Sequence, residues 1–365
     1  MPFGNIYKEK KIFVTGHTGF KGSWLCAWLL ELGAKVCGYS IDVPTKPSHF
    51  EILGLGDSIK HVQGDILDKE KLSNTLQYFE PDMVFHLAAQ PLVRRSYENP
   101  VLTFETNTIG TLNVLEGIRH IPSVRVGVII TSDKCYRNQE WGWGYRESDL
   151  LGGKDPYSAS KGCAELIIYS YIQSFFKHEP NVCSTRAGNV IGGGDWAEDR
   201  IVPDAVRAWS VGKKLVIRSP EATRPWQHVL EPLSGYLWLG TKLWQGDTGA
   251  VGEAFNFGPQ AGVNQSVGEL IEALAEKWPT SMWEVAGSAE EKAKESTLLK
   301  LSCDKALDRL KWQATLDFKE TVKFTREWYQ EYYNKDASDM IQVTNSQIAE
   351  FVNLAKERGQ MWVTG

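Results

Sequence analysis

A tyrosine and a lysine stand four residues apart in the run Tyr157-Ser-Ala-Ser-Lys161 and could carry acid/base chemistry. Residues four apart lie on the same face of a helix, so both side chains would point the same way. An ammonium group beside a phenol favours the phenolate, so we expect the pKa of Tyr157 to fall from about 10 toward neutrality. Such a tyrosine can remove a proton from an alcohol that Ser132 holds by a hydrogen bond. Alone, a Tyr-x-x-x-Lys pair is more often an ordinary exposed pair on a helix.

A glycine-rich segment upstream gives this pair its context. The apolar run 11–15 predicts a buried strand, and the apolar spacing over 24–32 predicts a helix. Between them stand Gly16, Gly19 and Gly22. A strand, a glycine turn and a helix N-terminus together can bind the pyrophosphate of a dinucleotide. Three glycines in ordinary turns remain the alternative for this segment taken by itself.

The ends of the following strands predict the rest of a cofactor site. A second strand over 35–41 ends at Asp42, about twenty residues after Gly22, where an acid binds adenosine ribose and disfavours NADP. The alternative for Asp42 is a turn residue before Pro44. A fourth strand over 83–89 ends in small residues, which let a cofactor lie across the strand ends. We therefore expect NAD, bound by Gly16, Thr18, Gly19, Phe20, Gly22, Asp42, Asp65, Ile66, Leu87, Ala88, Ala89, Tyr157 and Lys161.

From about residue 8 to about residue 335, the chain resembles the extended short-chain dehydrogenase/reductases. Within that group it is most similar to the NAD-dependent nucleotide-sugar 4,6-dehydratases that act on cytidine sugars. Four strings carry the resemblance: G-H-T-G-F-K-G-S-W at 16–24, H-L-A-A-Q-P-L-V-R-R-S-Y at 86–97, T-S-D-K-C-Y at 131–136 and R-A-G-N-V-I-G-G-G-D-W at 186–196.

The resemblance implies an internal redox cycle on CDP-glucose. Tyr157 would take the C4 hydroxyl proton while hydride passes to NAD, and water would then leave across C5 and C6. Return of the hydride to C6 would give CDP-4-keto-6-deoxyglucose and regenerate NAD. The resemblance also implies a cytoplasmic homodimer or tetramer that supplies deoxysugars for surface polysaccharide such as the lipopolysaccharide O-antigen.

The elimination step needs its own acid and base. Thymidine-sugar dehydratases of the family carry an Asp-Glu pair where this chain has Asp133-Lys134. We expect Asp133 as acid and Lys134 as base, which requires a partly neutral lysine. The alternative for Lys134 is a phosphate or hydroxyl contact without proton transfer. The expected catalytic residues are Ser132, Asp133, Lys134, Tyr157 and Lys161.

Residues that bind the nucleotide sugar are expected mostly in the second half of the chain. Asn189 lies in a glycine-rich loop able to wrap a diphosphate. Arg224 is similar to the diphosphate-binding arginine of the family, and a guanidinium grips phosphate bidentately. Trp196 and Trp226 could stack on the base or the sugar, although most of the 14 tryptophans must be core residues. The expected substrate-binding residues are Gln90, Arg95, Asn189, Arg200, Arg224 and His228.

Strands alternating with helices predict an α/β fold, a doubly wound parallel sheet of Rossmann type with a smaller C-terminal α/β substrate lobe. We expect the NAD-binding domain over residues 1–180 and 228–258. The nucleotide-sugar-binding lobe is expected over 181–227 and 259–365, with an appended helix at 346–358.

Composition narrows the function further. The 365 residues carry a net charge of −5, which offers no basic surface for nucleic acid. The six cysteines are scattered without metal-ligand spacing, so we expect free thiols in the cytoplasm and no metal. No apolar run approaches the ~18 residues of a membrane helix, and no signal peptide is expected at the N-terminus.

Three other functions stay open. A nucleotide-sugar 4-epimerase, or a dehydratase of another nucleotide-glucose, would share the fold, NAD and the Tyr-Lys pair, but the epimerase would not need Asp133-Lys134. A non-catalytic NAD-sensing or RNA-binding protein would not need the intact Ser132, Tyr157 and Lys161. A net oxidoreductase that consumes NADPH is disfavoured by Asp42.

Overall fold

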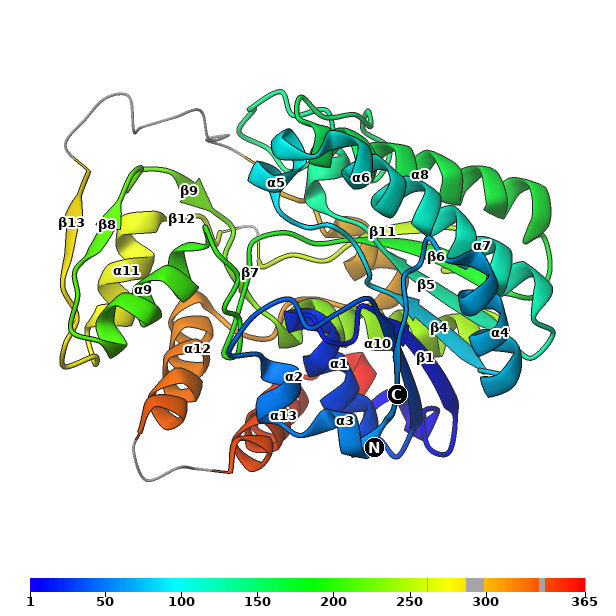
Figure 1. Ribbon diagram of the computed structural model, residues 1–365, viewed down its shortest axis with the longest axis horizontal. Coiled ribbons are helices and arrows are strands. Elements are labelled where there is room, and N and C mark those ends of the chain that lie inside the picture. The colour runs from blue at the N-terminus through cyan, green and yellow to red at the C-terminus, as the bar shows by residue number, and fades with distance from the viewer. Residues whose placement is uncertain (261, 287–298, 335–338, 365) are drawn as a thin grey trace.

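The computed structural model describes residues 1–365 except 261, 287–298, 335–338 and 365. Seven of the described strands form one parallel sheet in the order β11-β6-β5-β4-β1-β2-β3 (Figure 1). They are β1 (Lys11–Thr15), β2 (Lys35–Ser40), β3 (Lys60–Gln63), β4 (Met83–His86), β5 (Val126–Ile130), β6 (Asn181–Arg186) and β11 (Ala254–Asn256). The strand order reverses between β1 and β4, and open α/β sheets bind ligands at such a reversal. The predicted Rossmann-type sheet is confirmed.

Helices cover both faces of the sheet, so successive strand residues enter two different cores. Ile12 and Val14 of β1 pack into the core on one face, and Phe13 packs into the core on the other. Helices α1 (Phe20–Glu31) and α10 (Leu230–Trp244) cover the first face. Helices α4 (Lys69–Phe79), α7 (Gly110–His120) and α8 (Pro156–Phe175) cover the second. Burial on both faces explains why the central strands β1, β4 and β5 are nearly continuous apolar runs, whereas the edge strand β3 is polar and largely exposed.

A smaller lobe lies beside the sheet, on the left of Figure 1. Its strands pair in twos, β8 with β13 and β9 with β12, while β7 pairs with β10 near the sheet. The strands of these pairs are β7 (Val190–Ile191), β8 (Leu215–Ile217), β9 (Thr223–Arg224), β10 (Gln227–His228), β12 (Gln265–Ser266) and β13 (Trp283–Val285). The helices of this part are α9 (Ile201–Ser210), α11 (Val267–Ala275) and α12 (Phe318–Tyr333).

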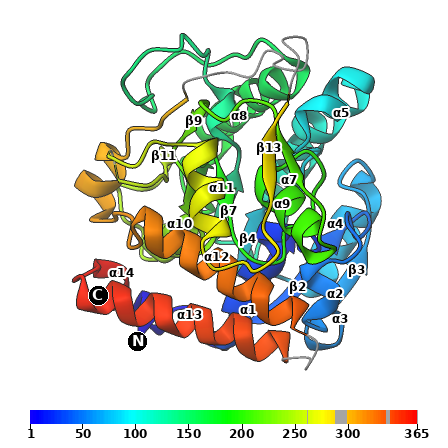
Figure 2. The same cartoon turned by 90° about the vertical axis from the view of Figure 1, so that its left-hand side faces the viewer.

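Two expected boundaries are wrong. The chain was expected to leave the sheet at residue 181, but β6 pairs there with β5 and β11 inside the sheet. The last residues were expected in the substrate lobe, but α13 (Met340–Glu357) packs on α1 as well as α12 (Figure 2). The reason is aromatic packing, because Phe351 contacts Trp28 and Trp362, with ring centroids 5.8 and 5.7 Å away. The expected appended helix also begins earlier, at Met340.

Short helical elements complete the described chain. They are η1 (Pro2–Asn5), α2 (His49–Ile52), α3 (Leu55–Ser58), α5 (Val93–Glu98), α6 (Pro100–Phe104), η2 (Glu105–Ile109), η3 (Asp133–Cys135), η4 (Ala306–Leu310) and α14 (Met361–Thr364). All six cysteines are free thiols, as expected. Within the described ranges, no helix has both the length and the apolar character needed to cross a membrane.

Candidate active site

The glycine turn between β1 and α1 leaves no room for side chains on its inner side. Gly16 has a φ of +73°, and a Cβ built on it would lie 2.6 Å from the nitrogen of Ala88 at the end of β4. A Cβ on Gly22 would lie 2.1 Å from the Gly16 carbonyl oxygen. A Cβ on Gly19 would meet only that oxygen, at 3.3 Å, so the outer side of the turn is open. Gly19 caps α1 without a side-chain hydrogen bond, which leaves the first N–H groups of the helix available to a pyrophosphate.

Other expected cofactor residues lie at the ends of β2 and β3. Asp42 is exposed just past β2, and its carbonyl accepts a 2.6 Å hydrogen bond from the Thr18 hydroxyl. This bond ties the glycine turn to the strand end that carries the acid. Asp65 uses one carboxylate oxygen to accept the Leu67 N–H at 2.9 Å. The side chain of Ile66 is buried in the sheet core, so any contact with a cofactor would have to come from its backbone.

The end of β4 is organised by Thr15 of β1. Its hydroxyl accepts hydrogen bonds from the backbone N–H groups of Leu87 at 3.1 Å and Ala88 at 3.2 Å. It also lies 2.7 Å from Nδ1 of His86, whose pKa is lowered to about 3 by burial. His86 is therefore a packed core residue. Leu87, Ala88 and Ala89 follow the strand, half-buried, beside the glycine turn.

The structure brings the expected catalytic residues together at the ends of β5 and α8. Ser132 donates a 2.8 Å hydrogen bond to Oδ1 of Asp133 and accepts the Lys134 N–H at 3.2 Å. Tyr157 and Lys161 lie one turn apart at the start of α8, which packs on η3. Ser132 also lies beside the Tyr157 phenol. Four of the five side chains are buried, and Lys134 is half-buried.

The expected pKa of Tyr157 is wrong for the protein alone. Burial of the phenol raises the pKa of Tyr157 to about 12, which outweighs the opposing effects of the Ser132 hydrogen bond and of Arg200. Burial likewise lowers the pKa of Lys161 to about 8, and Glu165 opposes that shift. The residue types in the sequence indicate the lysine–tyrosine pair but not its desolvation, and burial is the larger effect here.

Sequence reasoning missed Lys21, the lysine inside the glycine turn. Burial lowers the pKa of Lys21 to about 8, the nearby cations Arg200 and Lys161 add to this, and Asp133 opposes it. These interactions place Lys21 near Arg200, Lys161 and Asp133, and Arg200 also lies near Tyr157. A field of positive sign suits the phosphates of a cofactor or substrate. The only signal in the sequence was one charged residue at the start of an apolar helix.

Two of the expected substrate residues, Arg200 and Asn189, lie in segments that approach the site. Arg200 donates a 2.9 Å hydrogen bond to Asp195, and its side chain is 38% exposed. Asn189 adopts a φ of +53° and is half-buried. Arg224 is the last residue of β9, opposite Gln265 of β12, and donates to the Thr223 carbonyl at 2.8 Å. Arg95 is exposed on α5.

Gln90 and His228, two further expected substrate residues, make their contacts inside the protein. The Gln90 amide donates to the Leu92 carbonyl and to Thr103, and accepts the Leu92 N–H at 2.7 Å, so it braces its own loop. His228 is 0% exposed, and burial lowers its pKa to about 3. Its ring lies 5.9 Å from that of Trp24, inside an aromatic core.

The two tryptophans considered for stacking are also core residues. Trp196 is 3% exposed and packs edge-on against Trp328 and Tyr329. Trp226 is 7% exposed, and its indole N–H donates to the Gln265 carbonyl at 3.1 Å. Both therefore agree with the alternative that most tryptophans of this chain are core residues.

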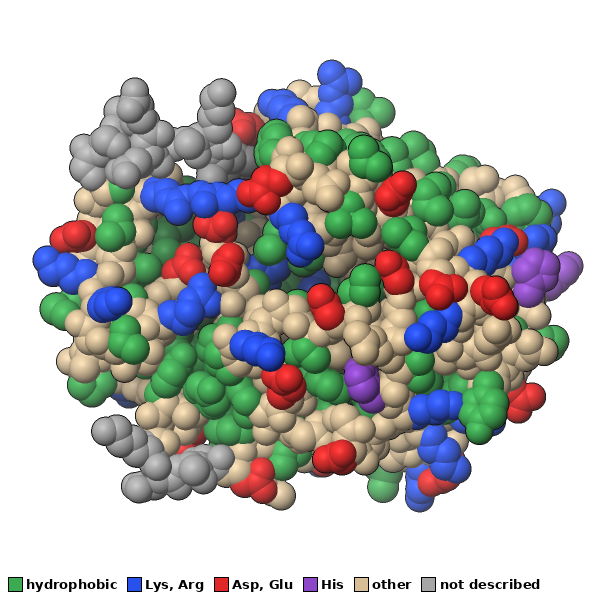
Figure 3. Space-filling model, in the orientation of Figure 1, with side chains coloured by type: hydrophobic (Ala, Val, Ile, Leu, Met, Phe, Trp, Pro, Cys, Tyr) green, Lys and Arg blue, Asp and Glu red, His purple; other side chains and the backbone are tan. Residues whose placement is uncertain are grey.

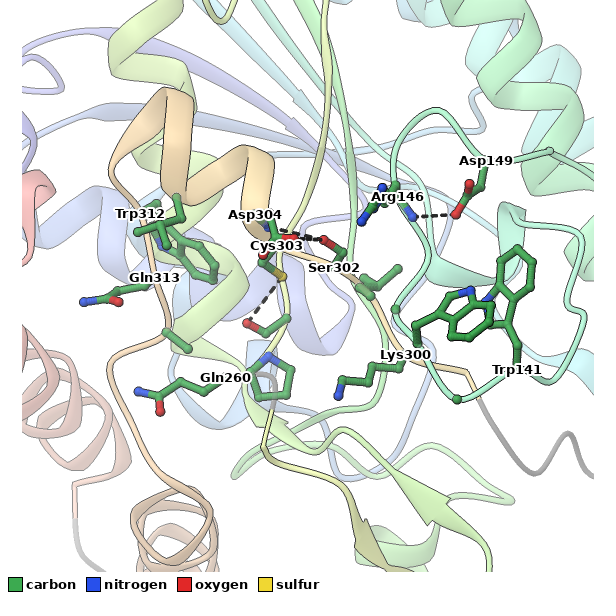
Figure 4. Close-up of a pocket in the computed structure, with 18 residues that line it drawn as sticks. Trp141, Arg146, Asp149, Gln260, Lys300, Ser302, Cys303, Asp304, Trp312 and Gln313 are labelled. Carbon is green, nitrogen blue, oxygen red and sulfur yellow. Dashed lines mark hydrogen bonds between the residues drawn. The ribbon is translucent and has the colours of Figure 1, made fainter.

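A cavity of about 930 Å³ lies between the loop around Trp141 and segments 258–260 and 300–304 (Figure 4). None of the expected catalytic, cofactor or substrate residues lines it. In the part of the chain that the structure describes, no group of three or more His, Cys, Asp or Glu side chains is arranged to hold a metal ion. The chemistry must therefore be sought at the ends of β1, β4 and β5.

Gly188 is a second residue that the sequence analysis did not single out. A Cβ on Gly188 would lie 2.0 Å from Oδ2 of Asp133. The loop after β6 therefore packs directly on the buried carboxylate, and only glycine leaves it in place. Arg186-Ala-Gly-Asn189 was recognised as a glycine-rich loop, but this role depends on a contact between distant segments.

Comparison with known proteins agrees with this geometry. A family model described as GDP-mannose 4,6 dehydratase matches residues 13–325. The chain is 44% identical to the CDP-glucose 4,6-dehydratase of Salmonella typhimurium over 356 residues, which are 96% of this chain and 98% of the relative.

Solved structures share the architecture. An epimerase of Methanothermobacter thermautotrophicus matches with a TM-score of 0.75 and 26% identity, over 92% of this chain and 97% of its own. The UDP-glucose 4-epimerase of Thermus thermophilus, solved in complex with NAD, matches with a TM-score of 0.73 and 25% identity, over 88% of this chain and 99% of its own.

The Gly188 contact predicts a selective defect. Gly188→Ala should displace the Asp133 carboxylate, because its methyl group would overlap Oδ2. A displacement of about 1 Å at a catalytic group can cost on the order of a hundredfold in rate. We expect turnover to fall by that order while the unfolding midpoint stays close to the parent. Gly142→Ala, whose Cβ would have no atom within 4 Å, is the matched control. Parent-like turnover in Gly188→Ala would show that Asp133 is not placed by this contact.

Proposed function

The chain belongs to the family described as GDP-mannose 4,6 dehydratase, and on that premise we propose that it dehydrates CDP-glucose to CDP-4-keto-6-deoxyglucose with NAD as resident cofactor. The observation that carries the proposal is the placement of Asp133 and Lys134 in η3, directly beside Ser132, Tyr157 and Lys161. Ser132, Tyr157 and Lys161 suit the oxidation of an alcohol, and Asp133 and Lys134 suit the removal of water. The near full-length similarity to a CDP-glucose 4,6-dehydratase supports the cytidine nucleotide.

The residues at the strand ends fit NAD. The open outer side of Gly19 and the uncapped start of α1 would receive the pyrophosphate, and exposed Asp42 would receive the adenosine ribose. A carboxylate at that position repels the extra phosphate of NADP. When bound, NAD supplies a hydride acceptor whose reduced form later acts as the donor.

The chain's own residues then divide the proton transfers. Tyr157 takes the C4 hydroxyl proton, and Ser132 holds that hydroxyl by a hydrogen bond. Burial gives the Tyr157 phenol a high pKa, which the Arg200 guanidinium opposes, and Lys161 lies one turn further along α8 as a second cation. Lys134 removes the C5 proton once C4 is a ketone, because the carbonyl makes that proton acidic. Asp133 gives a proton to the C6 hydroxyl, which leaves as water, and the hydride from C4 returns to C6.

A 4-epimerase is the second candidate, since the solved epimerases share this fold. That reaction needs Tyr157, Lys161 and Ser132 but no acid and base for water loss. The buried carboxylate of Asp133, on which Gly188 packs, has no task in it. A non-catalytic NAD sensor or RNA binder would likewise not need five assembled acid/base residues. We therefore favour the dehydratase.

Four nucleotide sugars distinguish these functions. The purified protein with NAD should convert CDP-glucose to a 4-keto-6-deoxy product at a kcat/KM above that for dTDP-, UDP- and GDP-glucose. Mass spectrometry detects the loss of one water molecule from the sugar. Conversion with unchanged mass would indicate an epimerase instead. Stoichiometric loss of NADPH absorbance would indicate a net reductase.

The two half-reactions should separate in Lys134→Met. The variant keeps Tyr157, Lys161 and Ser132, so C4 oxidation should continue, but no base remains for C5. Reduced nicotinamide should accumulate on the enzyme in stopped-flow absorbance while 4-keto-6-deoxy product falls by about a hundredfold or more. Lys300→Met, in the separate cavity, is the matched control. Parent-like product formation by Lys134→Met would make Lys134 a binding residue only.

We also propose that the protein is a homodimer joined through α8. Exposed apolar side chains gather over α6 and α8 (Figure 3), and the largest exposed fractions are 59% for Leu166, 63% for Tyr169 and 65% for Val101. Neighbouring elements add Tyr97 and Ile109 to the same face. A two-fold axis would let such a face cover itself.

Light scattering after size exclusion tests the dimer. We expect a dimer mass for the parent and a monomer mass for Leu166→Glu, because the interface would bury an unpaired charge. Tyr78→Glu, at an exposed aromatic residue on α4, should leave the dimer intact. A monomeric parent, or a dimeric Leu166→Glu, would contradict the proposed face.

A further inference from the structure

A buried ion pair lies next to the catalytic residues, between α8 and β6. Oε2 of Glu165 accepts a hydrogen bond from Nη2 of Arg186 at 2.8 Å, and Oε1 accepts from Nε at 3.0 Å. The two side chains are 3% and 4% exposed. Removing both charges from water costs free energy that such a pair does not always recover. Neither residue belongs to the catalytic set, so another role is to be sought in what the pair contacts.

The pair holds both ends of the segment that carries the catalytic residues. Glu165 accepts a hydrogen bond from the hydroxyl of Thr131, the residue before Ser132. Arg186 donates from Nη1 to the Tyr136 hydroxyl at 2.7 Å. Residues 131 and 136 enclose Ser132, Asp133 and Lys134. One ion pair therefore helps to fix the positions of Ser132, Asp133 and Lys134.

Both ends of the segment have additional anchors that reinforce the ion pair. The Thr131 hydroxyl also donates to the Thr185 carbonyl at 3.1 Å, and the Tyr136 hydroxyl donates to Asn256 at 2.8 Å. Ser184 donates to Oε2 of Glu165 at 2.8 Å. All of these partners lie on β6 or β11, the rigid edge of the sheet. The network thus joins the catalytic segment to the sheet rather than to a surface loop.

The same carboxylate faces the catalytic lysine. Glu165 follows Lys161 by one turn of α8, so both lie on one face of the helix. The titratable groups around Lys161 are Tyr157 and Glu165 on α8, Cys135 on η3, His86 on β4 and Lys21 at the start of α1. Burial lowers the pKa of Lys161 to about 8, and Glu165 is the first of the groups that oppose this.

We propose that Glu165 and Arg186 are positioning residues that hold the segment 132–134 in register with α8 and compensate the buried charge of Lys161. Arg186 supplies the geometry through its bidentate fork and its bond to Tyr136. Glu165 supplies both the Thr131 contact and the negative charge beside Lys161. The effect on catalysis rests on the dehydration proposed above, whereas the contacts of the ion pair do not depend on that reaction.

The pH profile of kcat/KM tests the charge that Glu165 provides. Turnover needs the Lys161 ammonium, so activity is lost as the pH rises through the pKa of Lys161. Glu165→Gln keeps the shape but removes the anion and leaves Arg186 as an uncompensated cation. We expect the alkaline limb to move about one pH unit lower. A purely structural role would lower the rate without moving that limb.

Three further variants complete the test. Glu165→Asp should return the limb toward its parent position, because it restores the charge. Glu165→Gln combined with Arg186→Met removes both charges, so the limb should lie above that of Glu165→Gln alone. Glu179→Gln, which breaks the exposed pair with Arg125, should leave the profile unchanged. An alkaline limb that stays in place in folded Glu165→Gln overturns the charge role.

The positioning role has its own variant, which keeps all charges. Arg186→Lys cannot form the bidentate contact and the Tyr136 bond together. We expect product formation to fall at least about tenfold with the alkaline limb unmoved. Parent-like turnover in Arg186→Lys overturns the positioning role. This test can still be carried out if Glu165→Gln does not fold. A parent that dehydrates no nucleotide-glucose would instead refute the proposed function, a result visible before any variant is made.

Discussion

The site depends on a close approach of two backbones at Gly16, where a Cβ would lie 2.6 Å from the nitrogen of Ala88. Because Gly16 has no side chain, the glycine turn after β1 packs against the end of β4, at the reversal of strand order. The end of β5, with Ser132, lies on the neighbouring strand of the same edge. The position of cofactor chemistry beside acid/base chemistry therefore follows from parallel strands that all end at one edge.

Burial then sets the chemistry of the groups at that edge. It raises the pKa of Tyr157 to about 12 and lowers that of Lys161 to about 8, which shifts both groups toward their neutral forms. Charges must counter this effect, and the structure supplies Arg200 near the phenol and Glu165 near the lysine. A dehydratase needs this balance between burial and nearby charge for two proton transfers. One removes the proton of the C4 hydroxyl, and the other removes the proton on C5. The pairing of Glu165 with Arg186 lets one network serve both.

Local sequence patterns predicted much of the fold and part of the candidate site. The features that they missed depend on contacts between distant segments. The strand over 11–15 has its expected bounds, because it is a short apolar run whose residues are mostly buried. The spacing of Tyr157 and Lys161 indicated their shared face. The packing of Gly188 on Asp133 joins distant segments and has no local signal. The aromatic surroundings of His228 likewise could not be read from its residue type, because Trp24 and Phe324 come from distant parts of the chain.

The central claim is that one hydride leaves C4 and returns to C6 within a single site. CDP-glucose carrying deuterium at C4 tests it most directly, with the product analysed by NMR and mass spectrometry. The account predicts that the product retains the deuterium, at C6, and that solvent hydrogen enters at C5, since the C5 proton passes through Lys134. Deuterium retained at C4 with no loss of water would identify an epimerase. Deuterium lost to free nicotinamide or solvent would contradict the internal return of the hydride.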